Sequence, residues 1–248
     1  MMQITPTVKQ LLIINVIFFA GTQFVGESAY QILSLYFPEN PTFEFWQPLT
    51  HMFMHGNLMH ILFNMFALYS FGSALEHFWG GKKFLFFYIS CGLGAALLHT
   101  AVNYFQFHQG LDALVQNGFS ESEAIQVLNG KNNQQLIGLI NSPEYGNFVG
   151  AYFGNAVGAS GAVYGLLVAF AFMMPNAELA LMFVPIPIKA KYFVPGLLLI
   201  DLFLGVSGKS IFGGSSGIAH FAHIGGAIIG FLMMWYWKKD EVSNSRWN

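Results

Sequence analysis

The sequence predicts an all-α membrane protein in which six transmembrane helices form one bundle and the fourth helix is short. Composition is the first reason: 54% of the 248 residues are hydrophobic and only 9% are charged, which is too apolar for a soluble domain of this size. The arrangement of the apolar residues in long blocks and the placement of the basic residues are the other two. We expect a single membrane domain over residues 1–248.

Six apolar blocks are candidates for membrane crossings. A hydrocarbon core of about 30 Å takes about 20 helical residues per crossing, and two of the six blocks are short or interrupted. The blocks are continuous and rich in Leu, Phe, Ala and Gly, whereas strands of a membrane barrel alternate over about 10 residues. The predicted helices lie near residues 9–26, 57–79, 83–105, 160–174, 191–206 and 219–237.

The basic residues fall almost entirely on one side of the predicted bundle. They precede the first helix, occupy the second-to-third and fourth-to-fifth connections, and follow the last helix, and only Lys131 and Lys209 lie on the other side. By the positive-inside rule both termini are cytoplasmic. We therefore predict a multi-pass protein of the plasma (inner) membrane.

Two outer connections carry structure of their own. Residues 27–56 hold many aromatic residues and no Lys or Arg, which is typical of a loop partly embedded at a membrane interface. Residues 106–150 form a polar extracytoplasmic insertion. Within it, Ser120 and Glu123 have the spacing of a capping box, and a second short helix is expected over 132–141, before Pro143.

A third outer connection is a candidate lid. Residues 205–219 are rich in Gly and Ser, so we expect this loop to be flexible and to move together with the fifth helix when a substrate enters.

Polar residues inside the bilayer are costly and therefore mark candidate sites. Ser160 lies fifteen residues before Pro175, where the fourth helix ends, and His223 lies fifteen residues before Lys238. At 1.5 Å per residue both are about 22 Å above the inner boundary. Ser160 and His223 are therefore predicted at one level, near the outer face.

A histidine and an asparagine on the second helix lie at a similar level. His60 and Asn64 are about 30 and 24 Å above Gly80 and, being four residues apart, share a helical face. Such a set supports acyl transfer, in which imidazole takes the proton of a serine nucleophile. Amides at the helix start near Ser160, with His60 and Asn64, would stabilise the oxyanion.

The glycines around Ser160 have a simpler interpretation as packing residues. Gly161 and Gly165 form a small-xxx-small pair, as do Gly226 and Gly230, and such pairs usually mark helix contacts. The two interpretations agree, because close packing of the fourth and sixth helices would bring Ser160 to the base.

Other polar residues leave alternatives open. His99, about 24 Å above Lys83, remains a possible base by depth. Asp201 lies only about 15 Å above Lys191, about 7 Å too low for a Ser–His–Asp triad, so we expect a structural or gating contact. His220 is expected to make a loop-level polar contact.

A metal site and a transporter are competing functions. His51 with His55, and His220 with His223, have spacings that suit metal ligands. Against a metalloenzyme, the sequence has no HExxH motif, and we expect no helix carboxylate at the depth of the histidines. Against a transporter, no paired broken helices are apparent.

Three motifs resemble those of the rhomboid family of intramembrane serine proteases. They are HGNLMHILFNMFALYSFGSALE from His55, GASGAVYG from Gly158, and AHIGGAIIG from Ala222. The resemblance covers roughly residues 9–105 and 150–238. It implies a rhomboid-like bundle whose short fourth helix carries the nucleophile.

The resemblance also implies roles for individual residues. Ser160 is the nucleophile and His223 the base of a Ser–His dyad, which favours His223 over His99. The oxyanion-stabilising role falls to His60 and Asn64, and the supporting positions are Tyr164, whose ring would pack on the catalytic imidazole, Gly158, Gly161, Gly226 and Gly230.

The expected partners are single-pass transmembrane substrates, cut near the outer membrane face, and the lipid bilayer. The family implies substrate helices that unwind easily near the cut, with a small residue before the scissile bond. We expect no cofactor, no metal and no nucleic acid. Because the family also contains inactive members that bind clients, a client-binding pseudoprotease remains an alternative.

Gln47 stands where many members carry Arg after Trp, so a lipid contact made by that Arg is not carried over to this chain.

Overall fold

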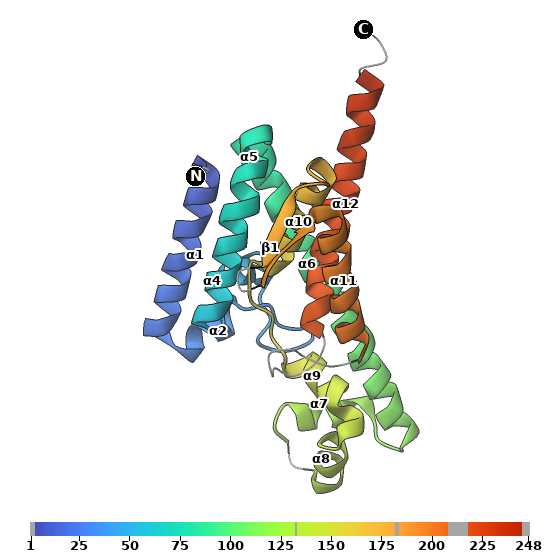
Figure 1. The fold of residues 1–248 in the computed structure, drawn as a ribbon. Coiled ribbons are helices and arrows are strands. Elements are labelled where there is room, and N and C mark those ends of the chain that lie inside the picture. The colour runs from blue at the N-terminus through green and yellow to red at the C-terminus, as the bar shows by residue number, and fades with distance from the viewer. Residues whose placement is uncertain (1–2, 132, 182–183, 208–217, 245–248) are drawn as a thin grey trace.

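The computed structural model describes residues 3–131, 133–181, 184–207 and 218–244, and over these the chain is mostly helical (Figure 1). The predicted lid at 205–219 lies mainly outside the described residues. In chain order the elements are α1 (Pro6–Val25), α2 (Glu27–Leu33), α3 (Gln47–Thr50), η1 (His51–Phe53), α4 (Leu58–Ala67), η2 (Leu68–Gly72), α5 (Ser73–Trp79), α6 (Gly81–Gln116), α7 (Glu121–Leu128), α8 (Gln134–Ile140), η3 (Pro143–Tyr145), α9 (Gly146–Phe153), α10 (Ser160–Met173), β1 (Glu178–Leu181), β2 (Val184–Lys189), α11 (Ala190–Ser207) and α12 (Ile218–Asn244).

Among the described residues, four helical spans are long and apolar enough to cross a membrane: Pro6–Val25, Leu58–Trp79, Gly81–Gln116 and Ala190–Ser207. The second span comprises α4, η2 and α5, where η2 is one π-helical turn. Ser160–Met173 is apolar but shorter, and α12 has 27 residues. The start of α1 and the end of α12 point to the same end of the molecule (Figure 1).

The core is built around α10. Nine of its fourteen residues are buried, because α6 and α12 pack against it closely while α4 and α11 add further contacts. Small residues allow this: a Cβ added at Gly226 would lie 1.9 Å from the Gly161 carbonyl oxygen, and one at Gly230 would lie 2.8 Å from Gly165 Cα. The backbones of α10 and α12 are therefore in direct contact.

A glutamate fastens the start of α1 to the second span. The Glu76 carboxylate accepts hydrogen bonds from the backbone N–H groups of Thr7 and Val8, each at 2.9 Å, and from the Thr5 hydroxyl. These are groups of the first turn of α1, which has no side-chain cap of its own. Glu76 therefore satisfies donors that a helix start leaves without intrahelical partners.

The outer insertion folds as a small helical unit. α6 continues to Gln116, eleven residues past its predicted end at 105; α7 and α9 pack against this extension, and α8 packs against α7. The capping box predicted at Ser120 and Glu123 is confirmed, as is the short helix before Pro143, whereas α9 was not predicted. The insertion's core includes Phe37 from the loop at 27–56, whose ring is tilted by 47° against that of Phe107 with 5.1 Å between ring centroids.

The connection between α10 and α11 contains a short β-hairpin, which the sequence did not predict and which leaves the described chain mostly helical. There β1 and β2 form a two-stranded antiparallel sheet with Glu178 opposite Lys189. The prolines of this segment break a helix, and its Val and Ile residues favour an extended chain. Hydrogen bonds from Lys191 N to Pro175 O at 3.1 Å and from Ala190 N to Ala177 O at 2.9 Å close the hairpin, so α11 starts at the level where α10 ends.

Candidate active site

Ser160 is the first residue of α10, and its position is set by the extended segment before it. Gly158 has φ of +128°, a conformation that residues with a Cβ rarely adopt. Its N–H donates to the His51 carbonyl at 2.9 Å. The start of α10 has no side-chain cap, so the amides of its first turn remain available as donors beside Ser160.

The imidazole of His223 lies against this serine. His223 Nε2 is 2.9 Å from Ser160 Oγ, and the Tyr164 ring stacks on the imidazole with centroids 4.2 Å apart and planes 10° from parallel. His99, on α6, instead has its Nε2 at 3.2 Å from the Asn103 amide. Of the two histidines that depth alone allowed, the structure brings His223 to Ser160.

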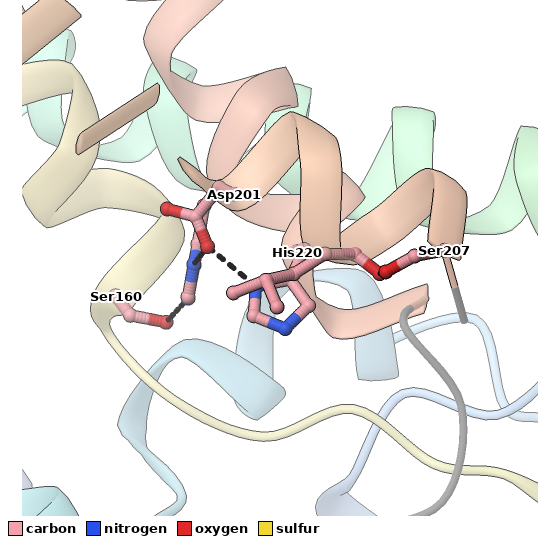
Figure 2. Close-up of polar contacts among 6 residues, drawn as sticks. Ser160, Asp201, Ser207 and His220 are labelled. Atoms are coloured by element: carbon pink, nitrogen blue, oxygen red, sulfur yellow. Dashed lines mark hydrogen bonds and ion pairs between the residues drawn. The ribbon is translucent and has the colours of Figure 1, made fainter. Parts of the chain in front are cut away.

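Asp201 lies on the other side of the same imidazole, where the sequence analysis did not place it. Figure 2 shows Ser160, an imidazole and Asp201 joined in one line of contacts: His223 Nδ1 is 3.2 Å from Asp201 Oδ1. The depth calculation placed Asp201 about 7 Å too low, because it treated the helices as straight, parallel rods perpendicular to the membrane. The conclusion that Asp201 is too low for a triad is therefore wrong.

His220 also reaches this carboxylate, so the expectation of a loop-level contact is wrong. Its Nδ1 is 2.5 Å from Asp201 Oδ1 (Figure 2). Ligand atoms of Asp201, His220 and His223 all lie within 4.8 Å of one another, which suits a metal ion. The expectation that no helix carboxylate lies at the level of the histidines is also wrong.

His60 faces Ser160 across Gly158. A Cβ built on Gly158 would lie 2.7 Å from His60 Nε2 and 3.5 Å from Ser160 Oγ, so both groups border the same small space. His60 Nδ1 accepts from the Gly56 N–H at 3.4 Å. In that tautomer Nε2 carries the proton and is a donor toward the space beside Ser160.

Asn64 is buried one turn further along α4. Its amide nitrogen donates to the His60 carbonyl at 3.0 Å, a bond within the helix that occupies one of two amide hydrogens. The other hydrogen leaves Asn64 able to act as a donor.

Two outer-loop histidines lie beside the site, His51 in contact through its backbone and His55 through its ring. His51 Nδ1 donates to the Gln47 carbonyl at 3.1 Å, and burial lowers the pKa of His51 to about 4. His55 is buried, with its ring edge-on to His60 at 5.0 Å, and burial lowers its pKa to about 3. Both are therefore neutral near pH 7, and His51 holds the carbonyl that fixes Gly158.

Gln47, which follows Trp46, is buried inside the outer loop. Its amide nitrogen donates to the carbonyls of Gln31 at 3.2 Å and Thr42 at 2.9 Å, while its amide oxygen accepts from the Tyr36 N–H at 3.2 Å. Gln47 therefore ties together the backbone of this loop.

Comparison with known proteins identifies the family. The rhomboid domain family matches residues 42–121 and 126–239. An uncharacterized mitochondrial rhomboid protein of Schizosaccharomyces pombe is 27% identical over 212 residues, covering 79% of this chain and 53% of that protein. The chain thus spans about half the length of this relative.

The relative contradicts one prediction. It is named as mitochondrial, so our prediction of a plasma (inner) membrane protein with cytoplasmic termini is wrong. The distribution of Lys and Arg orders the two faces of a bilayer but does not say which membrane the bilayer belongs to. With more than half of its residues matched, the chain belongs to the rhomboid family.

Proposed function

We propose that this rhomboid is an intramembrane serine endopeptidase whose nucleophile is Ser160 and whose general base is His223. One observation carries the proposal: the 2.9 Å contact between His223 Nε2 and Ser160 Oγ. That contact lies within the range for proton transfer, and it forms at the uncapped start of a buried helix.

In the proposed first step, Ser160 Oγ attacks the scissile carbonyl carbon while its proton passes to His223 Nε2. The oxyanion accepts hydrogen bonds from the Ser160 N–H, from His60 Nε2 and from the Asn64 amide. His223 then gives the proton to the leaving amine as the C–N bond breaks, and water hydrolyses the acyl-enzyme by the same route.

We also propose how the chain crosses the membrane. The four long spans, the shorter helix α10 and the 27-residue helix α12 are six crossings of a single membrane domain over residues 1–248, with the outer insertion as part of it. The substrates are single-pass transmembrane proteins, cut near the face at which α10 begins, where the substrate helix unwinds beside a small residue. By analogy with the named relative, we propose a mitochondrial membrane.

The test compares purified wild type with Ser160→Ala and His223→Ala in detergent. Each is assayed for cleavage of a model transmembrane substrate and for labelling by a fluorophosphonate. We expect both activities in the wild type and neither in Ser160→Ala. Full cleavage by Ser160→Ala would refute the serine mechanism, and a wild type that binds substrate without cleavage or labelling would indicate a client-binding pseudoprotease.

A metal-dependent membrane enzyme is the second candidate, because Asp201, His220 and His223 form a set that suits Zn²⁺. The same assay with a chelator separates the two. Loss of wild-type cleavage in chelator, with recovery on added Zn²⁺, would favour the metal, whereas the serine mechanism predicts unchanged cleavage.

A further inference from the structure

We propose that Asp201 is a positioning residue that extends the Ser160–His223 pair to a triad, and that His220 holds its carboxylate in place. This inference rests on the proposed protease function and goes beyond the dyad that the family resemblance implies. It concerns how one imidazole is oriented by Asp201, which is buried in α11, and by His220, which is partly buried in α12.

The contact of His223 with Asp201 determines the tautomer of its imidazole. A neutral imidazole carries one N–H, and a base needs its lone pair on the nitrogen that faces the serine. With His223 Nδ1 at 3.2 Å from Asp201 Oδ1, a proton on Nδ1 donates to the carboxylate. Nε2 then presents its lone pair to Ser160 Oγ at 2.9 Å, which is the arrangement a Ser–His–Asp triad uses.

The burial of Asp201 shows which groups its carboxylate depends on. The residue is 4% exposed, and a carboxylate in such a place requires partners that compensate its lost hydration. Its side-chain partners are His220 and His223, with the Tyr164 hydroxyl beside it. His223 is the imidazole of the candidate site, the Tyr164 ring stacks on it, and the His220 ring lies 6.1 Å from it between centroids, so the carboxylate is directed at that site.

His220 holds the Asp201 carboxylate from the same helix as His223. It precedes His223 by three residues on α12, so both side chains occupy one helical face. His220 Nδ1 and His223 Nδ1 contact the same oxygen, Asp201 Oδ1, at 2.5 and 3.2 Å (Figure 2). The shorter contact, from His220, fixes the rotamer of the Asp201 carboxylate. Through the longer contact the carboxylate then orients the His223 ring.

Charge balance during the reaction fits this arrangement. When the Ser160 O–H bond breaks and Oγ bonds to the carbonyl carbon, the proton moves to Nε2 and His223 becomes an imidazolium. The Asp201 carboxylate stabilises that positive charge without taking the proton itself. His223 returns the proton to the leaving nitrogen, and Asp201 ends the cycle unchanged.

The experiment measures kcat and KM for Asp201→Asn and Asp201→Ala with a model transmembrane substrate, together with the rate of fluorophosphonate labelling. Ser207→Ala is the control, because it removes a polar group from the same helix. Among the contacts described, the Ser207 hydroxyl donates only to the Leu204 carbonyl, at 3.1 Å. We expect kcat and labelling to fall about 10²- to 10⁴-fold in Asp201→Ala, with KM within about twofold of wild type. A merely structural aspartate would instead change KM and the unfolding temperature together.

A second measurement needs no variant at Asp201. Nitrogen-15 NMR of the histidine-labelled wild type, with His223→Gln to assign the signal, reports which ring nitrogen carries the proton. A protonated Nδ1 supports the proposal, and a protonated Nε2 overturns it. Wild-type kcat in Asp201→Ala would overturn it too while leaving the protease function intact, whereas a wild type that neither cleaves nor is labelled would mean that the proposed function itself has failed.

Discussion

The backbone contact between α10 and α12 predicts that one methyl group at position 226 separates His223 from Ser160. In Gly226→Ala the new Cβ would lie 1.9 Å from the Gly161 carbonyl oxygen, where at least 3.0 Å is needed. The obstacle is backbone, which no rotamer change can move aside, so the helices must separate by about 1 Å at this point.

The size of the kinetic effect follows from the position of His223, three residues before Gly226. Its Nε2 is 2.9 Å from Ser160 Oγ, and a separation of about 1 Å takes this contact beyond hydrogen-bonding distance. A misplacement of that size costs about 10²-fold in rate. Overpacking should also cost about 1–3 kcal/mol of stability.

The assay measures cleavage, fluorophosphonate labelling and thermal unfolding in detergent for three alanine variants. In Gly21→Ala the added Cβ meets nothing within 4 Å, so the same substitution in α1 should leave activity unchanged. Gly230→Ala should be intermediate, because its nearest obstacle, Gly165 Cα, is at 2.8 Å. If Gly226→Ala cleaves and unfolds like Gly21→Ala, the contact does not align the site as argued.

Three further predictions concern the surroundings of the site. Gly158→Ala should lower kcat at least about tenfold, because φ of +128° is strained for alanine and the new Cβ would lie 2.7 Å from His60 Nε2; wild-type kcat would contradict this. Burial lowers the folded-state pKa of His51 to about 4 and of His55 to about 3. The stability due to their neutral forms is therefore complete above about pH 6.5. Below that pH the free energy of unfolding falls by about 1.4 kcal/mol per pH unit for each histidine, until the pH reaches its folded-state pKa. Unfolding temperatures from pH 7 to 4.5 measure this, and His51→Gln should reduce the slope. Glu76→Ala should cost about 2–3 kcal/mol, because it strands the first amides of α1; thermal unfolding measures the loss, and an unchanged midpoint would argue against that anchor.

Depth along a helix is the part of the site that the sequence encodes most directly. Ser160 and His223 are equally far from their inner boundaries, and because α10 and α12 pack through glycines, equal depth becomes proximity. The same calculation does not predict the place of Asp201, because depth along a helix axis leaves out helix tilt and the reach of the Asp201 and His223 side chains, which meet at 3.2 Å. Helix tilt depends on packing between elements, which the spacing of residues within one helix does not specify.

Local signals likewise predicted local structure and no more. The capping box at Ser120 and Glu123 marks the start of α7 because both hydrogen bonds form within one turn. The continuation of α6 to Gln116 has no such signal: its extra turns are polar on one side and are stabilised by the insertion packing on the other, through residues such as Phe107 and Phe148. Contacts between distant segments decide where this helix ends.

The outer insertion has a structural connection to the candidate nucleophile that its distance in sequence conceals. α9 ends at Phe153, and the chain then pairs with the loop before the second span through reciprocal hydrogen bonds of Leu35 and Ala156, both at 2.9 Å. Two residues later, the Gly158 N–H donates to the His51 carbonyl, and α10 begins at Ser160. Because a polar backbone below the membrane surface must find partners within the protein, these bonds determine where an extended segment can end and a buried helix can start. The insertion packs against the same loop, because Phe37 lies in the insertion's core.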